Sequence, residues 1–335
     1  MVALSDYTVF TSAVMFNDST SSSIAVEIAT AMQNNSALLG WGTSEQGLVS
    51  WASEASVMVN AADWAADLST LSNIACPSGF FPMMQQVLDP IEIDNCDVHT
   101  VCFVMSDGDN IQWILNSFAT STDWWASPDR GQIPITWTIS PALVDLAPTI
   151  LKYLYRTASN NSTTGGGSDY FIAAPSGTGY VYPDLYADIS GFAQTTANYM
   201  AQSDLSILNV IADSNPAASD TTPFTSQSQI DAVFWYLYSN YAGLKGAISW
   251  SQGKPIIGAR EMLWDGFNTP ATLAAKLNAS RKSCTSVDGY SLVVVHVWDQ
   301  TVDTVIQTVN LLDERVVVVQ ADQFVQSIIN NRVGQ

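Results

Sequence analysis

VCFVMSDGDNIQW, residues 101–113, is an apolar run of strand length that stops at an acidic turn and resumes with helical spacing. This pattern is typical of a strand–loop–helix unit in an α/β fold. Asp107 and Asp109 would then follow the carboxyl end of the strand, where open α/β sheets and (β/α) barrels bind their ligands. Two carboxylates there can bind a hard cation, act as acid and base, or accept hydrogen bonds from sugar hydroxyls, and this stretch leaves all three alternatives open.

The composition describes a well-buried globular protein. The 335 residues are 47% hydrophobic and 13% charged, and no apolar run approaches the roughly 20 residues that a membrane-spanning helix needs. The 31 acidic residues outnumber the 11 basic ones and give a net charge of −20. Because nucleic-acid binding depends largely on lysines and arginines that neutralise phosphates, this charge argues against a nucleic-acid partner. We expect a soluble chain with one large domain and a smaller one.

The order of apolar segments divides the chain into two parts. Residues 1–97 predict a small N-terminal α/β lobe, in which Tyr7–Phe16 is β-rich and Ala61–Leu71 is helical. In residues 98–335, strand-length runs alternate with helical patterns, which predicts a (β/α) barrel-like domain, with an open doubly wound sheet as the alternative. The predicted strands are Thr100–Met105, Ile133–Ile139, Tyr170–Ala174, Ser206–Ile211, Gly246–Ser249, Pro255–Ile257, Tyr290–Val295 and Arg315–Val319. The predicted helices are Pro141–Tyr155, Leu185–Met200, Ser228–Tyr241, Thr269–Asn278, Val302–Leu312 and Ala321–Ile329.

In a barrel, residues that follow the strands share one rim, and this rule selects the candidate site. His296 closes the apolar run before it, and the flat faces of tryptophans at strand ends suit sugar rings. Carbohydrate is therefore the expected ligand. The candidate catalytic residues are Asp107, Asp109, Glu261 and His296, and the candidate substrate-binding residues are Tyr180, Tyr182, Trp250, Trp298, Asp213 and Asp299.

A glycosidase needs two carboxylates across the scissile bond. We expect Asp109 to act as base or nucleophile, Glu261 as acid, and His296 to orient a carboxylate or a sugar hydroxyl. A calcium-dependent carbohydrate-binding module is another alternative, with a divalent cation near Asp107 and Asp109. Glu45 also follows a strand end, and we interpret it as a helix-capping carboxylate.

Residues 177–183, GTGYVYP, form a tight turn that presents two tyrosine hydroxyls. The turn is not a phosphate loop, because it has neither a lysine nor a third glycine at the required spacing. At this motif the chain resembles the GxGYxYP family of putative glycoside hydrolases. The resemblance includes residues 106–113 (SDGDNIQW), 137–141 (WTISP) and 295–298 (VHVW), and it extends into the N-terminal lobe. It implies a smaller α/β lobe before a barrel-like domain, and a glycoside hydrolase activity.

Cysteines and glycosylation sequons indicate a secreted, extracellular glycoprotein. Cys76 and Cys96 flank a segment with proline and glycine and are a plausible disulfide, whereas Cys102 in the apolar strand is expected to be a buried thiol. Asn-X-Ser/Thr sequons begin at Asn17, Asn34, Asn160, Asn161 and Asn278. The same features fit a non-catalytic structural glycoprotein that self-assembles into an extracellular fibre, sheath or wall, and this is the alternative function.

Overall fold

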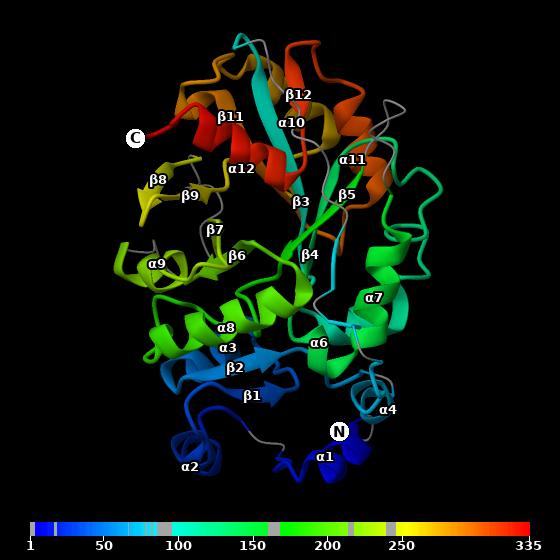
Figure 1. Ribbon diagram of the computed structural model, residues 1–335, viewed down its shortest axis with the longest axis vertical. Helices are drawn as coiled ribbons and strands as arrows, with labels where there is room; N and C mark the ends of the chain where they lie inside the picture. The colour runs from blue at the N-terminus through cyan, green and yellow to red at the C-terminus, as the bar shows by residue number, and fades with distance from the viewer. Residues whose placement is uncertain are drawn as a thin grey trace.

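The structure is a computed structural model of the chain, and it describes residues 4–16, 19–65, 67–77, 79–81, 83–85, 96–159, 168–213, 218–238 and 246–335. Within these residues the strands form a two-stranded parallel sheet and a ten-stranded sheet. Figure 1 shows the small sheet at one end of the molecule and the large sheet beyond it, with helices packed around both.

The small sheet belongs to a lobe formed by the first part of the chain. β1 (Ser36–Leu39) and β2 (Val57–Asn60) pair in parallel, and α3 (Glu45–Glu54) connects them. Ser44 caps α3, because its Oγ accepts a hydrogen bond from Gly47 N at 3.2 Å. The other helices of the lobe are α1 (Ser5–Thr11), α2 (Ser23–Ala31) and α4 (Leu68–Ser72).

The large sheet is parallel except at one edge. Among the described residues its order is β10-β11-β3-β4-β5-β6-β7-β9-β8, β12 pairs with the first half of β3, and β8 lies antiparallel to β9. The strands are β3 (His99–Met105), β4 (Ile135–Ile139), β5 (Asp169–Ala173), β6 (Ile207–Ala212), β7 (Ala232–Leu237), β8 (Ile248–Ser251), β9 (Lys254–Gly258), β10 (Glu261–Leu263), β11 (Tyr290–Val295) and β12 (Val316–Val318).

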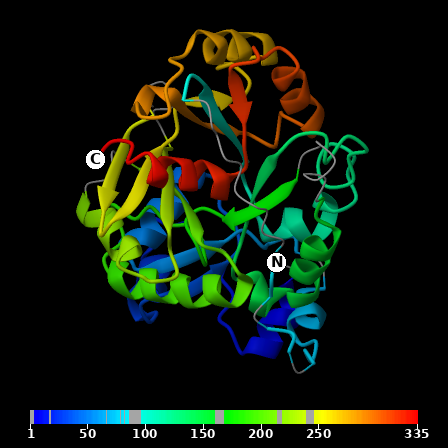
Figure 2. The same ribbon diagram turned by 45° about the horizontal axis from the view of Figure 1, so that its top comes forward.

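The sheet curls into a barrel-like shape because one continuous segment pairs with both of its sides (Figure 2). β9 pairs with β7, and β10, two residues further along, pairs with β11. Between them, Ala259 N donates to Trp235 O of β7 and Arg260 N donates to Leu292 O of β11, both at 2.9 Å. The carboxyl ends of the parallel strands therefore meet at one mouth, and the predicted barrel-like α/β fold with a smaller lobe is confirmed.

Helices cover the outer face of the large sheet, and one helix fills its curl. The helices of this domain are α5 (Ile111–Trp113), which continues as the π-helical turn η2 (Ile114–Phe118), α6 (Leu143–Leu146), α7 (Pro148–Thr157), α8 (Ile189–Ser203), α9 (Ala218–Thr225), α10 (Pro270–Ala279), the 3₁₀ turn η5 (Val287–Gly289), α11 (Val302–Val309) and α12 (Ala321–Asn330). α12 lies inside the curl, where Phe324 packs against Phe234 of β7 and Tyr290 of β11, with ring centroids 6.2 and 5.7 Å apart. Because side chains alternate along a strand, the sheet divides two cores, one beneath the outer helices and one inside the curl.

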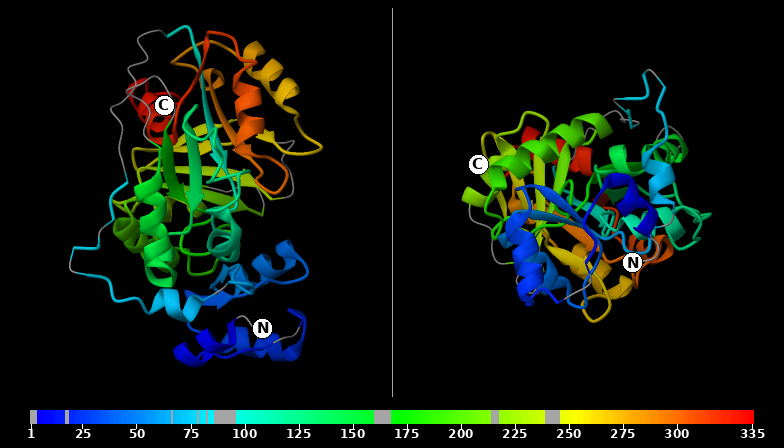
Figure 3. Two further views of the ribbon diagram at one scale, coloured as in Figure 1. Left: turned by 90° about the vertical axis from the view of Figure 1, so that its right-hand side faces the viewer. Right: turned by 90° about the horizontal axis from the view of Figure 1, so that it is seen from below.

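The lobe closes the mouth of the curled sheet. Figure 3 shows it lying across one end of the large domain. Val59 of β2 and Tyr180 of the loop after β5 exchange two backbone hydrogen bonds, of 3.2 and 2.7 Å. Leu48 and Val49 of α3 also belong to the core inside the curl. This core therefore runs from the lobe at one end to α12 at the other.

Two secondary-structure predictions were wrong. Ser228–Tyr241, expected as a helix, contains β7, whose sequence is AVFWYL. An apolar and aromatic run that packs on both faces lacks the alternation of apolar and polar residues that marks a strand. Residues 239–241 of that prediction lie outside the described residues. Tyr7–Phe16, expected to be β-rich, contains α1, in which Tyr7 and Phe10 lie on one face with ring centroids 6.4 Å apart. Ala61–Leu71 was expected as a helix; among its described residues, 61–65 and 67–71, the helix α4 begins at Leu68.

The predicted disulfide is corrected by the structure. Cys96 is bonded to Cys284, with Cα atoms 4.7 Å apart, and Cys76 is a free thiol. The two bonded cysteines precede the neighbouring strands β3 and β11, so tertiary pairing over 188 residues brings them together. Cys102 is buried in β3 as predicted, and burial raises the pKa of its thiol to about 12.

The sequons fall in different surroundings. Asn34 is exposed after α2. Asn278 is engaged in α10, where its Nδ2 donates to Leu311 O (2.9 Å) and its Oδ1 accepts from Asp313 N (2.8 Å). The sequons at Asn17, Asn160 and Asn161 lie outside the described residues. In the part of the chain that the structure describes, no helix has the length and apolarity to cross a membrane. The boundary at residue 97 stays a prediction.

Candidate active site

The turn after β3 carries the two acidic residues that the sequence singles out. Asp107 adopts a left-handed backbone conformation (φ 66°), and Gly108 N donates to Thr138 Oγ1 of β4 at 2.9 Å. A Cβ on Gly108 would lie 1.8 Å from Thr138 O, so this close approach of two backbones requires glycine. Asn110 then caps α5 by accepting a hydrogen bond from Trp113 N at 3.0 Å. The turn is fixed between two strands and one helix, with both carboxylates at the mouth.

Asp107 accepts a hydrogen bond at each carboxylate oxygen. Trp298 Nε1 donates to Oδ1 at 2.9 Å, and Ser106 Oγ donates to Oδ2. Trp298 lies in the loop after β11 and packs against Trp113, with ring centroids 5.4 Å apart. Two motifs that are far apart in the sequence therefore meet at this carboxylate.

The loop after β5 joins the lobe to the mouth. Gly179 lies so close to β2 that a Cβ there would be 2.7 Å from Met58 Cβ. The next residue, Tyr180, donates from its hydroxyl to Glu45 Oε1 at 2.9 Å. Its ring stacks on Trp41, with centroids 6.3 Å apart and planes inclined by 21°. The loop thus holds Glu45 of the lobe against the barrel.

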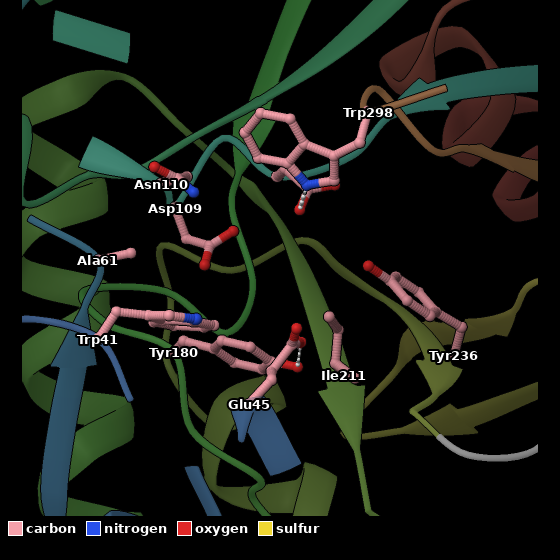
Figure 4. A pocket seen from close by; sticks show the side chains of 10 residues that line it. Trp41, Glu45, Ala61, Asp109, Asn110, Tyr180, Ile211, Tyr236 and Trp298 are labelled. Atoms are coloured by element: carbon pink, nitrogen blue, oxygen red, sulfur yellow. Dashed lines mark hydrogen bonds between the residues drawn. The ribbon is translucent and has the colours of Figure 1, made fainter. Parts of the chain in front are cut away.

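These elements enclose a cavity of about 220 Å³. Figure 4 shows the carboxylates of Glu45 and Asp109 pointing into it, Glu45 from the lobe and Asp109 from the β3 turn, with Trp298 on another side. Its lining residues are Trp41, Glu45, Ala61, Asp107, Asp109, Asn110, Tyr180, Ile211, Tyr236 and Trp298. Three carboxylates and two tryptophans therefore share one small space.

Burial controls the protonation of two of these carboxylates. Burial, reinforced by the negative charges of Asp107 and Glu45, raises the pKa of Asp109 well above its usual value. Burial also raises the pKa of Glu45; the hydrogen bond from Tyr180 opposes this shift, the charge of Asp107 adds to it, and His296 opposes it. Both groups consequently hold protons to higher pH than exposed carboxyl groups do.

His296 lies beside the cavity and outside its lining. Its Nδ1 is hydrogen-bonded to Asp299 Oδ1 at 2.9 Å, and its ring stacks on Trp264, with centroids 3.8 Å apart and planes inclined by 12°. Asp299 Oδ2 also accepts from Asp265 N at 2.6 Å. Because the charge of His296 acts on the pKa of Glu45, the pair lies close to the site. The roles expected for His296 and Asp299 stay predictions.

Glu261 does not line the cavity. It stands at the start of β10, where its Oε2 forms an ion pair with Lys276 Nζ at 2.9 Å and accepts a hydrogen bond from Asn268 Nδ2 at 3.1 Å. Both contacts are made to one oxygen of the carboxylate that the sequence analysis expected to act as acid, and its catalytic role stays a prediction.

Like Asp299, three further predicted substrate-binding residues lie outside the lining. Asp213 Oδ1 accepts from Gln46 Nε2 of the lobe at 2.8 Å. Trp250 lies on the edge strand β8, and its Nε1 donates to Val333 O at 2.8 Å. Tyr182 is fully buried in the core inside the curl. Their binding roles stay predictions.

The sequence analysis did not assign six of the lining residues to the site. They are Trp41, Glu45, Ala61, Asn110, Ile211 and Tyr236. Ser44 caps α3 in place of Glu45; Glu45 is the first residue of the helix, where a negative charge is favourable, and its carboxyl group lines the cavity. In the sequence, the one indication of a site role for Glu45 was that it is an acid that follows a strand end of the lobe. The docking of the lobe on the barrel, which gives that acid its place in the site, is a tertiary contact.

No cluster of three or more histidine, cysteine, aspartate or glutamate residues that could hold a metal ion occurs in the part of the chain that the structure describes. Both oxygens of Asp107 already accept protein hydrogen bonds. The divalent cation considered near Asp107 and Asp109 stays a prediction.

Two family models match the chain. The model of the GxGYxYP putative glycoside hydrolase C-terminal domain matches residues 97–328, and that of the GxGYxYP third domain matches residues 1–73. A crystal structure of a putative hydrolase from Bacteroides thetaiotaomicron VPI-5482, at 1.25 Å resolution, aligns with 97% of this chain at 30% identity and a TM-score of 0.84. The chain spans 64% of that protein's length. No curated protein matched the chain.

Proposed function

Because the chain belongs to the GxGYxYP family of putative glycoside hydrolases, we propose that the cavity at the mouth of its barrel hydrolyses glycosidic bonds. The observation that carries this proposal is the convergence of Glu45, Asp107 and Asp109 on one cavity, with the acids supplied by two different parts of the chain. Glycoside hydrolysis needs two carboxyl groups in different protonation states on either side of the scissile bond.

Glu45 is the general acid of the proposed mechanism. Its pKa is raised by burial, so it retains a proton that it can give to the leaving-group oxygen. The Tyr180 hydroxyl fixes one carboxyl oxygen and leaves the other directed at the cavity. Glu45 thus takes the role that the sequence analysis expected for Glu261.

Asp107 is the second carboxyl group of the proposed mechanism. Trp298 and Ser106 each donate a hydrogen bond to it, and its remaining lone pairs can serve a water molecule or the anomeric carbon. Asp109 holds a proton to higher pH, because burial, reinforced by the charges of Asp107 and Glu45, raises its pKa. The base or nucleophile role expected for Asp109 therefore passes to Asp107 within the same turn.

Aromatic side chains favour a sugar as the substrate. Trp41 and Trp298 line the cavity beside the carboxylates, and indole faces pack well on the apolar faces of pyranose rings. Asn110 and Tyr236 also line the cavity and carry polar groups that can bond to sugar hydroxyls.

A hydrolysis screen tests the proposal. Wild type, Glu45→Gln, Asp107→Asn and Asp109→Asn are incubated with soluble glycans and oligosaccharides of varied sugar and linkage, and released reducing ends are measured. We expect wild type to cleave at least one linkage, and Glu45→Gln and Asp107→Asn to lose activity by about 10²- to 10⁴-fold, the usual size of acid–base catalysis. Asp303→Asn, a change in the first turn of α11, is the matched control and should behave as wild type.

The same screen decides between a hydrolase and a structural glycoprotein. If folded wild-type protein cleaves no glycan, the hydrolase proposal fails and a structural role is the better account. Both functions agree with an extracellular location, which we propose on two grounds. The Cys96–Cys284 disulfide is typical of an oxidising compartment, and the sequon at Asn34 is exposed.

A further inference from the structure

The cavity is small for a polymer-binding site. Its volume of about 220 Å³ lies below the ~300–1,000 Å³ of pockets that bury drug-sized ligands. A space of this size suits one sugar ring better than a run of several rings.

The cavity is also closed on the side of the lobe. Tyr180 is tied to Val59 by two backbone hydrogen bonds and is covered by Trp41, and Ile211 and Tyr236 are buried beneath the cavity. Beyond them, the core inside the curl continues to α12. A glycan chain that enters the cavity therefore has no exit on the far side.

Trp298 marks the open side. Its side chain is 49% exposed although its Nε1 is held by Asp107 and its ring packs on Trp113. A ring fixed along one edge and packed on one side presents a rigid apolar surface to solvent at low entropic cost. Such a surface, next to a carboxylate, suits the sugar unit that follows the one in the cavity.

From these observations we propose that the cavity binds a single terminal sugar unit, that Trp298 supports the adjoining unit, and that the enzyme removes units from a chain end. The inference rests on the proposed hydrolase function and specifies its substrate. The bond cleaved joins the unit in the cavity to the unit on Trp298. Water adds across it, so that one free sugar unit and a chain shorter by one unit are formed.

Product analysis tests the proposal. The probes are cello-, xylo-, manno-, malto- and chito-oligosaccharides of two to six units, each also prepared with both ends chemically blocked, and early products are separated by size. The expected result is release of one unit at a time from free chains and no cleavage of chains blocked at both ends. Early fragments of several lengths, or cleavage of doubly blocked chains, would overturn the chain-end inference while leaving the hydrolase function intact. Absence of any hydrolysis would count against the hydrolase function itself.

Variants of Trp298 test the support of the second unit. On the cleaved trisaccharide, Trp298→Ala should raise KM by about 2- to 10-fold, the range of one aromatic contact. Trp298→Phe keeps a ring and should hold KM near wild type, while both variants lower kcat through the lost hydrogen bond to Asp107. Trp64→Ala is the control, since Trp64 is 69% exposed and does not line the cavity. An unchanged KM in Trp298→Ala would refute the role of Trp298.

Discussion

Replacing Gly108 with alanine should separate the β3 turn from β4. The new Cβ would lie 1.8 Å from Thr138 O and 2.7 Å from Ile139 N, both backbone atoms. Real Cβ atoms stay at least 3.0 Å from such neighbours, so moving from 1.8 to 3.0 Å displaces the turn by at least 1.2 Å. This movement also breaks the 2.9 Å hydrogen bond from Gly108 N to Thr138 Oγ1.

The cost of this displacement follows from its parts. Overpacking at a rigid site costs about 1–3 kcal/mol, and the hydrogen bond lost with it contributes about 1 kcal/mol. We therefore expect Gly108→Ala to lower the free energy of unfolding by about 2–4 kcal/mol. Because Asp107 and Asp109 flank the site of change, and a misplacement of about 1 Å can cost about 10²-fold in rate, kcat/KM should fall by about 10²-fold or more.

Denaturant unfolding and steady-state hydrolysis, both at a temperature where circular dichroism shows the variant folded, measure the two effects. The matched control is Gly42→Ala, whose Cβ would meet Leu48 Cβ at 3.4 Å, an ordinary contact. A Gly108→Ala protein with the stability and kcat/KM of the control would refute the backbone contact between the β3 turn and β4.

Three further predictions concern charges and the disulfide. Burial raises the pKa of Asp109, so the native state binds its proton more tightly than the unfolded state; stability is lost as pH rises from the usual aspartate value through the raised one. Asp109→Asn should therefore increase the free energy of unfolding at pH 7 by about 1–3 kcal/mol and leave it unchanged near pH 3. Arg130→Ala, which leaves Asp169 buried without its ion-pair partner, should cost about 3–5 kcal/mol. Replacing Cys96 and Cys284 by serine should cost about 2–4 kcal/mol.

Each of these variants has its own control, and denaturant unfolding gives the free energy of unfolding of every variant and control. Asp303→Asn should show no pH-dependent gain in stability; a gain equal to that of Asp109→Asn would contradict the explanation from burial. Arg315→Ala removes an exposed ion pair with Asp97 and should cost less than about 1 kcal/mol. For the disulfide, reducing agent should destabilise wild type and have no effect on the double serine variant.

Local sequence patterns predicted the strands, turns and helices whose limits are marked by nearby residues. Residues 101–113 predicted β3, the acidic turn and the helix after it, because strand, glycine turn and helix cap each leave a local mark. β7 was missed because a central strand buried on both faces shows no alternation between apolar and polar residues. Tertiary pairing alone decided the partner of Cys96.

The residues of the candidate site also fall into two groups, those that local sequence patterns predict and those that depend on tertiary contacts. Asp107, Asp109, Tyr180 and Trp298 stand at strand ends of the barrel, so the rule that strand ends share a rim was enough to group them. Glu45 belongs to the lobe, and its role depends on the backbone pairing and ring stacking that dock the lobe on the mouth. Long-range contacts of this kind leave no spacing pattern in the sequence.

The most direct test of the proposed site compares Glu45→Gln with Glu261→Gln. Both changes replace a glutamate by its neutral isostere, but only Glu45 lines the cavity, whereas Glu261 is paired with Lys276. On the best substrate of the hydrolysis screen, we predict that kcat/KM falls by about 10²- to 10⁴-fold in Glu45→Gln and stays near wild type in Glu261→Gln. A large loss in Glu261→Gln together with an active Glu45→Gln would contradict the account of the site.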